Sequence, residues 1–162
     1  MKRLTLKVDG RPRTVDAAED EPLLYVLAGQ LGLKGPRFGC GLAQCGSCSV
    51  LVDGVEIRSC VTPAASLEGK EIVTIEGLPA WHGRKGELHP VQTAMIEEQA
   101  AQCGYCYNGM VIKAAELLAK VPDPSEAQIK TAMNGHLCRC GTYPRIVKAV
   151  RRAAKAMAAE HA

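Results

Sequence analysis

The sequence is poor in aromatic residues: one Trp, one Phe and four Tyr make up 4% of its 162 residues. Any core must therefore be filled by aliphatic side chains, a thin supply if the chain forms two domains of about 80 residues each. Long hydrophobic runs are missing as well, since no stretch reaches the roughly 18 apolar residues that span a bilayer. We therefore expect no membrane span.

A strong charge of one sign is also lacking. Twenty Lys and Arg residues face 17 Asp and Glu residues, which gives a net charge of +3. No basic stripe is interleaved with aromatic residues, so we expect no nucleic-acid partner. The start of the chain is basic, but polar Lys7 and Asp9 follow at once, in place of the apolar segment of a secretory signal. We expect a cytoplasmic protein.

Cysteine, by contrast, is abundant. The eight cysteines fall into two groups of four: Cys40, Cys45, Cys48 and Cys60, then Cys103, Cys106, Cys138 and Cys140. In a reducing compartment, clustered cysteines bind metal more often than they form disulfides. Each half of the chain is therefore expected to be stabilised by its own metal site.

The region between the two groups is rich in Gly and Pro and has no hydrophobic period, which is typical of a linker. We predict one domain at residues 1–76, a linker at 77–89 and a second domain at 90–162. In the first domain, alternating apolar residues predict strands at residues 4–8, 13–15, 49–52, 55–58 and 71–75. Leucines at helical spacing predict a helix over residues 22–31, ended by Gly32.

The second domain has the pattern of helices. Apolar spacing predicts helices at residues 91–101 and 110–119. Asp123 is expected to cap a third helix, with Pro124 at its first position, and Thr142 to cap the last one. The fold class is therefore α+β, a small mixed sheet followed by a helical domain.

The first cysteine motif is C-x4-C-x2-C, and Cys60 follows after eleven more residues. This is the spacing of plant-type ferredoxins, which bind a [2Fe-2S] cluster. Gly39, Gly41 and Gly46 allow the turns that bring three thiolates of one short loop together, and such turns aim N–H groups at sulfur. The alternative, a four-cysteine zinc site, prefers two C-x2-C pairs. The spacing favours the cluster.

The second motif is Cys103-Gly104-Tyr105-Cys106, and Cys138-Arg139-Cys140 follows after 31 residues. These cysteines lie in loops between predicted helices. The last helix begins just after them, and its positive N-terminal end favours a negatively charged cluster. Taken alone, this spacing leaves zinc open. Beside an iron–sulfur domain in the same chain, it favours a second [2Fe-2S] cluster.

The chain resembles the small iron–sulfur subunit of the molybdenum hydroxylases, the xanthine oxidase family, from residue 4 to about residue 154. The resemblance is carried by Gly39-Cys40-Gly41-Leu42-Ala43-Gln44-Cys45-Gly46, Gln102-Cys103-Gly104-Tyr105-Cys106 and Leu137-Cys138-Arg139-Cys140-Gly141-Thr142-Tyr143. The sequence is most similar to the branch that oxidises isoquinoline or nicotinate. Tyr107-Asn108-Gly109-Met110 is nearest to the nicotinate-type relatives.

The resemblance implies a ferredoxin-like β-grasp domain followed by a four-helix [2Fe-2S]-binding domain. It implies that the C-terminal cluster lies nearer to molybdenum, and that Gln102 contacts the pterin of the molybdenum cofactor on a large partner subunit. Cys140 is implied to approach the same pterin while it ligates iron. The resemblance also implies that electrons leave from the N-terminal cluster to a cytochrome or another acceptor, or to a flavin subunit. Catalytic residues are expected on the large subunit, with none in this chain.

Three other functions stay open on the residues alone. They are the same role in an aldehyde-oxidising or purine-oxidising complex, a free two-cluster ferredoxin, and a zinc-bound adaptor. Gln102 and the 138–140 loop favour a subunit over a free carrier, since a free carrier has no pterin to contact. The four histidines, His82, His89, His136 and His161, lie at no ligand spacing. Two alternatives also stay open for Leu78 and Trp81: packing on a partner subunit or covering the domain junction.

Overall fold

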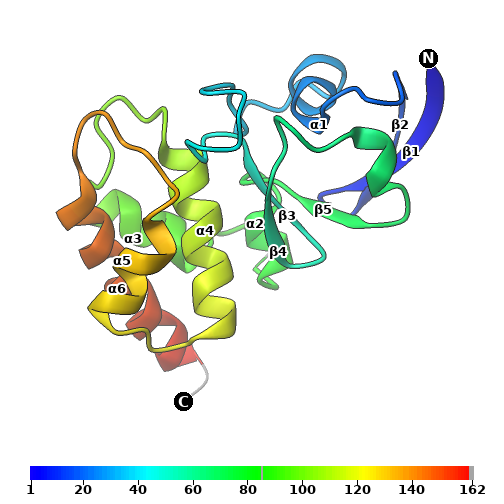
Figure 1. Ribbon diagram of the computed structural model, residues 1–162. Helices are drawn as coiled ribbons and strands as arrows, with labels where there is room; N and C mark the ends of the chain where they lie inside the picture. Colours follow the sequence, from blue (N-terminus) through cyan, green and yellow to red (C-terminus); the bar gives the residue numbers. More distant parts are fainter. Residues whose placement is uncertain (85, 161–162) are drawn as a thin grey trace.

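The computed structural model describes residues 1–84 and 86–160, so His161 lies outside the described residues. A five-stranded sheet makes up one end of the molecule and a group of helices the other, as Figure 1 shows. Within the described residues, no helix is long and apolar enough to cross a bilayer.

The sheet is built from two hairpins and a closing strand. Its strands are β1 (Lys2–Val8), β2 (Arg11–Ala17), β3 (Ser49–Val52), β4 (Val55–Arg58) and β5 (Glu71–Val73). Their order is β2-β1-β5-β3-β4, in which β1 and β5 are parallel and the other neighbours antiparallel. Both hairpin turns, Asp9-Gly10 and Asp53-Gly54, have positive φ at both residues, the conformation that two-residue hairpin loops require. The predicted mixed sheet is confirmed.

Strand β5 ends earlier than the predicted 71–75. The carboxylate of Asp9 accepts hydrogen bonds from the backbone N–H and the hydroxyl of Thr74, at 2.7 and 2.8 Å. These bonds replace sheet pairing, and the N–H of Gly77 then donates to the carbonyl of Thr74 to turn the chain. A side chain distant in sequence therefore ends the strand.

One helical segment packs on the sheet. It consists of α1 (Leu23–Tyr25) and a π-helical continuation, η1 (Val26–Gln30), and Gly32 with φ +65° follows it. Leu23 and Leu27 are fully buried against Leu6 and Ile72. The helix predicted at 22–31 is confirmed, although its second half is wider than an α-helix. A short 3-10 helix, η2 (Ala64–Leu67), also contributes to this core.

The second region contains four longer helices. They are α3 (Pro90–Glu97), α4 (Tyr107–Lys120), α5 (Glu126–Met133) and α6 (Tyr143–Glu160). Helix α3 is shorter than predicted because Gln99 adopts a left-handed φ of 49° and the N–H of Ala100 bonds back to the carbonyl of Met95. The core here is aliphatic, with Met95 and Met110 among its fully buried residues.

The predicted start of α5 was wrong. Ser125, not Asp123, is the capping residue: its hydroxyl accepts the N–H of Gln128 at 3.3 Å, and the Gln128 side chain accepts the N–H of Ser125 at 2.8 Å. This reciprocal pair satisfies two helix-end donors, and the helix therefore begins at Glu126.

The predicted linker contains a short helix, α2 (Leu78–Trp81). Leu78 is fully buried in the core of the helical region, and Trp81 packs against the same core. The two residues therefore cover the junction between the two regions. The division into residues 1–76, 77–89 and 90–162 stays a proposal.

Candidate metal centres

The first cysteine loop wraps its own backbone around sulfur. The Sγ of Cys40 accepts hydrogen bonds from the N–H groups of Leu42, Gln44 and Cys45 at 3.2–3.3 Å. Positive φ values at Gly41, Ala43 and Gly46 make this curl possible. Burial raises the pKa of the Cys40 thiol, but the three N–H donors outweigh it and bring the pKa down to about 7. The loop therefore favours a thiolate at Cys40.

The four thiols of the first quartet lie in two pairs. Cys40 and Cys45 are neighbours on the loop, and Cys48 lies against Cys60, packed with Leu24. Cys48 and Cys60 are buried, and burial, together with the neighbouring Cys60 thiol, raises the pKa of Cys48 to about 11. A neutral thiol is favoured there unless a metal supplies positive charge.

The second quartet has the same two-pair arrangement, built from two separate loops. Cys103 neighbours Cys140, and Cys106 neighbours Cys138, which itself lies near Cys103. The hydroxyl of Thr142 lies 3.4 Å from the Sγ of Cys138. Burial raises the pKa of Cys138, but hydrogen bonds from Thr142, Cys106 and the Cys140 backbone together outweigh it and lower the pKa to about 7. Burial raises the pKa of Cys106 to about 12.

These pairs fit a binuclear cluster better than a single ion. A mononuclear zinc site takes all of its ligands at one ion. A [2Fe-2S] cluster instead takes two ligands at each of two irons. The N–H groups at sulfur are the donors that stabilise an added electron. The residues present therefore fit two such clusters.

Comparison with known proteins agrees with this geometry. Residues 6–74 match the family described as "2Fe-2S iron-sulfur cluster binding domain", and residues 74–151 match "[2Fe-2S] binding domain". One nicotinate dehydrogenase subunit from Pseudomonas putida is 52% identical over 94% of both chains. The alpha subunit of isoquinoline 1-oxidoreductase from Brevundimonas diminuta is 50% identical, over 91% of this chain and 95% of the relative.

A solved structure extends the likeness to three dimensions. Quinoline 2-oxidoreductase from Pseudomonas putida contains a chain that superimposes with a TM-score of 0.89 at 35% identity, covering 98% of this chain and 96% of that one. The chain is an iron–sulfur subunit of the molybdenum hydroxylase family. The resemblance drawn from the sequence is confirmed, as are the ferredoxin-like and helical fold, the two [2Fe-2S] domains and the role in electron transfer.

The two cysteine loops of this iron–sulfur subunit touch each other. The N–H of Leu137, beside Cys138, donates to the carbonyl of Cys45 at 3.0 Å. The side chain of Asn108 donates to the carbonyls of Ser47 and Ser49, both at 2.9 Å. One backbone hydrogen bond, from Leu137 to Cys45, therefore links the two quartets, because Leu137 is the residue next to Cys138.

Glycines allow this close approach. A Cβ at Gly109 of α4 would lie 2.1 Å from the carbonyl oxygen of Gly46 in the first loop. A Cβ at Gly46 would lie 2.4 Å from the ring of His136. On another side of the first loop, Nη1 of Arg37 donates to the carbonyl of Gly104 at 3.1 Å, inside the second quartet.

Gln102 and Cys140 lie where the second quartet reaches the surface. Gln102 and Cys103 are exposed, Cys140 is half-buried, and Arg139 beside it is exposed. The structure therefore brings both residues to one open face, next to the metal site. The first quartet is less exposed than the second, because its Cys48 and Cys60 are buried.

Among the described residues, the three histidines are not gathered at the cysteines as ligands. His82 and His89 lie together, with ring centroids 4.5 Å apart, beside Trp81. His136 is buried, and its Nε2 lies 3.0 Å from Nη1 of Arg58 and 3.1 Å from Glu56. Burial, together with the charges of Arg58 and Lys113, lowers the pKa of His136 to about 3, so its ring is neutral.

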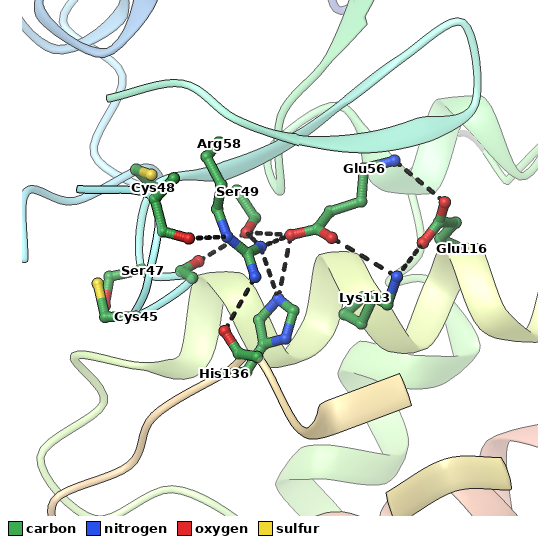
Figure 2. Close-up of polar contacts among 12 residues, drawn as sticks. Cys45, Ser47, Cys48, Ser49, Glu56, Arg58, Lys113, Glu116 and His136 are labelled. Atoms are coloured by element: carbon green, nitrogen blue, oxygen red, sulfur yellow. Dashed lines mark hydrogen bonds and ion pairs between the residues drawn. The ribbon is translucent and has the colours of Figure 1, made fainter. Parts of the chain in front are cut away.

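A polar network between the two regions was missed at the sequence level. Figure 2 shows its members: Ser49, Glu56 and Arg58 from the sheet, Lys113 and Glu116 from α4, and His136 from the loop after α5. Alternating charged residues on a short strand ordinarily indicate a solvated face. Nothing in the local pattern of β4 signals that α4 and the 134–142 loop cover that face.

Proposed function

We propose that this chain carries electrons from a molybdopterin centre on a large partner subunit, through its two clusters, to an external acceptor. The reaction that it serves is the hydroxylation of an N-heteroaromatic substrate such as nicotinate or isoquinoline. The observation that carries this proposal is the identity of about half of all residues, over nearly the whole length, with subunits of two enzymes named for those substrates. A bound [2Fe-2S] cluster supplies reversible one-electron oxidation and reduction.

We propose Cys40, Cys45, Cys48 and Cys60 as the ligands of the first cluster, and Cys103, Cys106, Cys138 and Cys140 as those of the second. The neighbouring thiols suggest the division between irons: Cys40 with Cys45 and Cys48 with Cys60, then Cys103 with Cys140 and Cys106 with Cys138. Iron analysis should give four irons per chain, two in each cluster. Stoichiometric zinc at the second quartet would contradict the assignment.

The open face at the second quartet is the proposed contact with the partner subunit. Gln102 is exposed there, and its amide can both donate and accept hydrogen bonds, as the mixed edge of a pterin requires. Cys140 is proposed to approach the same pterin. Phe38 and Leu42 are exposed beside the first quartet, at 50% and 67%, and we propose that side for the acceptor. The proposed acceptor is a cytochrome, another electron acceptor or a flavin subunit, and the cytoplasm is the proposed compartment.

The function is tested on the complex purified with its native partners. Molybdenum, four irons per small subunit and turnover of nicotinate or isoquinoline are expected, whereas the chain alone should oxidise neither substrate. Turnover of an aldehyde or a purine instead would favour the alternative complexes. Purification of the chain with both clusters but without any partner would favour a free ferredoxin.

The Gln102 proposal has its own test. Gln102→Ala leaves a polar pterin edge unpaired in a dry interface, which costs roughly 1–3 kcal/mol. Molybdenum content or steady-state turnover of the complex should fall, while both clusters keep their spectra. Gln44→Ala is the matched control, because Gln44 is an exposed glutamine in the other cysteine loop. If Gln102→Ala matches both the control and the wild type, the pterin role is wrong.

A further inference from the structure

The side chain of Arg58 reaches both cysteine loops at once. Its Nε donates to the carbonyl of Ala43 at 3.3 Å, in the first loop between Cys40 and Cys45. Its Nη2 donates to the carbonyl of Gly135 at 2.9 Å, three residues before Cys138. One guanidinium therefore bridges backbone oxygens that belong to two different metal sites.

Other contacts fix the plane of that guanidinium. Its Nη1 donates to the hydroxyl of Ser49 at 2.7 Å and lies 3.0 Å from Nε2 of His136, and the group is ion-paired with Glu56. Figure 2 shows Arg58 between Ser49, Glu56 and His136. The side chains of Arg58 and Glu56 are 17% and 8% exposed. Nearly all the donors of a rigid planar fork are therefore used.

The charges around Arg58 are balanced within the network. Glu56 also lies 3.6 Å from Lys113, and its N–H donates to Glu116 at 3.2 Å. Glu116 in turn accepts from Lys113 at 2.7 Å and from Lys120 at 2.6 Å. Two buried carboxylates are thus compensated by three cations, and Arg58 is the cation among them that also contacts both cysteine loops.

We propose that Arg58 is a positioning residue that holds the first cysteine loop at a fixed distance and orientation from the second. The transfer that this serves moves one electron: the second cluster is oxidised, the first is reduced, and no bond or proton is exchanged. The inference rests on the ligand sets proposed above. Lysine is a poor substitute in this role, because a single ammonium cannot reach the Ala43 and Gly135 carbonyls together in the fixed geometry of the fork.

The test uses the full chain with both clusters, in the variants Arg58→Lys and Arg58→Gln. The first readout is the magnetic interaction between the two reduced clusters in electron paramagnetic resonance, which depends on their separation and orientation. The second is hydrogen exchange of the segment that contains Leu137, whose N–H bonds to Cys45 across the junction. In both variants, the magnetic interaction between the clusters should become weaker or its signal broader. Hydrogen exchange of the segment that contains Leu137 should become faster.

The midpoint potential of the first cluster separates position from charge. Arg58→Lys keeps the positive charge and should hold that potential, whereas Arg58→Gln removes it and should lower the potential. Arg3→Gln is the charge-matched control, because Arg3 lies on β1 in an exposed pair with Asp16. It should leave the interaction, the exchange and the potential unchanged.

Folding and ligand binding are checked separately. Should Arg58→Gln fail to fold because Glu56 is left buried with one partner fewer, the double variant Glu56→Gln/Arg58→Gln removes both charges. Four irons per chain confirm that the ligand sets are intact, and fewer irons in the wild-type chain would count against those sets and not against Arg58. A lower melting temperature with wild-type magnetic interaction and exchange in Arg58→Lys would overturn the positioning role.

Discussion

The two cysteine quartets differ in how the chain brings four thiols together. Three cysteines of the first quartet share one nine-residue stretch, whose own N–H groups bond to Cys40. The second quartet takes two cysteines from each of two loops that are separated by α4 and α5. The first site is therefore specified by local backbone conformation, whereas the second depends on helix packing. Their neighbouring thiols nevertheless end in the same two-pair arrangement.

The contrast extends to the surroundings. Cys48 and Cys60 are buried in the small core around Leu24, whereas Cys103 is exposed. A site that depends on tertiary packing and also lies at the surface gains most from a partner that covers it. The difference thus agrees with the proposed contact between the second quartet and a large subunit.

Loss of a cysteine ligand is expected to have the largest effect and to distinguish the two quartets most clearly. Cys48→Ser should remove the first cluster and leave two of four irons, while the helical region stays folded, because Cys48 packs with Leu24 and Cys60 outside the helical core and the second quartet keeps its four cysteines. Cys106→Ser should remove the second cluster and also loosen the helices that its ligands connect. Iron analysis and helical circular dichroism check both. Equal loss of helical signal in the two variants would contradict the local-versus-tertiary distinction.

Filling the contact between the quartets should have the next largest effect. Gly109→Ala places a Cβ against the carbonyl of Gly46, an overpacking that costs roughly 1–3 kcal/mol, although alanine in a helix ordinarily gains about 1 kcal/mol. Denaturant unfolding of the loaded chain measures the change. Gly29→Ala, in an exposed helical position with nothing within 4 Å, is the control and should be neutral or stabilising. Equal effects of the two variants would refute the close approach.

Acid should affect the helical region before the sheet. Burial, together with the neighbouring His82 and Arg84, lowers the pKa of His89 from 6.5 to about 3. Between those values the unfolded chain binds a proton that the folded one does not, so stability falls as the pH drops from about 6.5 toward 3. In the sheet, burial raises the pKa of Asp9, and its protonation does not oppose folding.

The variant His89→Asn keeps a helix-capping side chain at the start of α3 and removes the titrating ring. Melting temperatures measured from pH 7 to pH 5 should fall less steeply than in the wild type. Hydrogen exchange at pH 5 should show faster opening of α3 than of β1 in the wild-type chain. An unchanged pH slope in the variant would show that His89 carries no part of the acid lability.

The smallest effect is expected from one hydroxyl. Thr142→Val removes a group that lies 3.4 Å from the Sγ of Cys138, and fewer hydrogen bonds to sulfur lower the potential of a cluster. The second cluster should therefore titrate at a lower potential, with the first cluster as internal reference. The N–H donors at Cys40 in the first site are backbone groups, which a side-chain substitution does not remove. A shift in both clusters would point to a global change instead.

The predicted and observed bounds of individual helices and strands show which features local sequence signals determine. Both hairpins, with their Asp-Gly turns, were predicted because turn chemistry and strand alternation are local. The start of α5 was misplaced because Asp123 and Ser125 are both good caps, followed three residues later by Glu126 and Gln128, and the structure uses the Ser125–Gln128 pair. The end of β5 was misplaced because Asp9, 65 residues from Thr74, accepts its hydrogen bonds.

From the sequence alone, the cysteine spacing determined the first cluster loop and the family. The alternation of apolar residues and the Asp-Gly turns determined the mixed sheet. Spacing is informative for the first cluster because three of the four cysteines and their N–H donors share one loop. Tertiary packing decided how the two loops meet: the Leu137–Cys45 bond, the contact of Gly46 with Gly109, and the position of Arg58 between Ala43 and Gly135. Apart from the Arg58–Ala43 bond, these contacts join residues more than 60 positions apart, and no local pattern of charge or hydrophobicity encodes such a pairing.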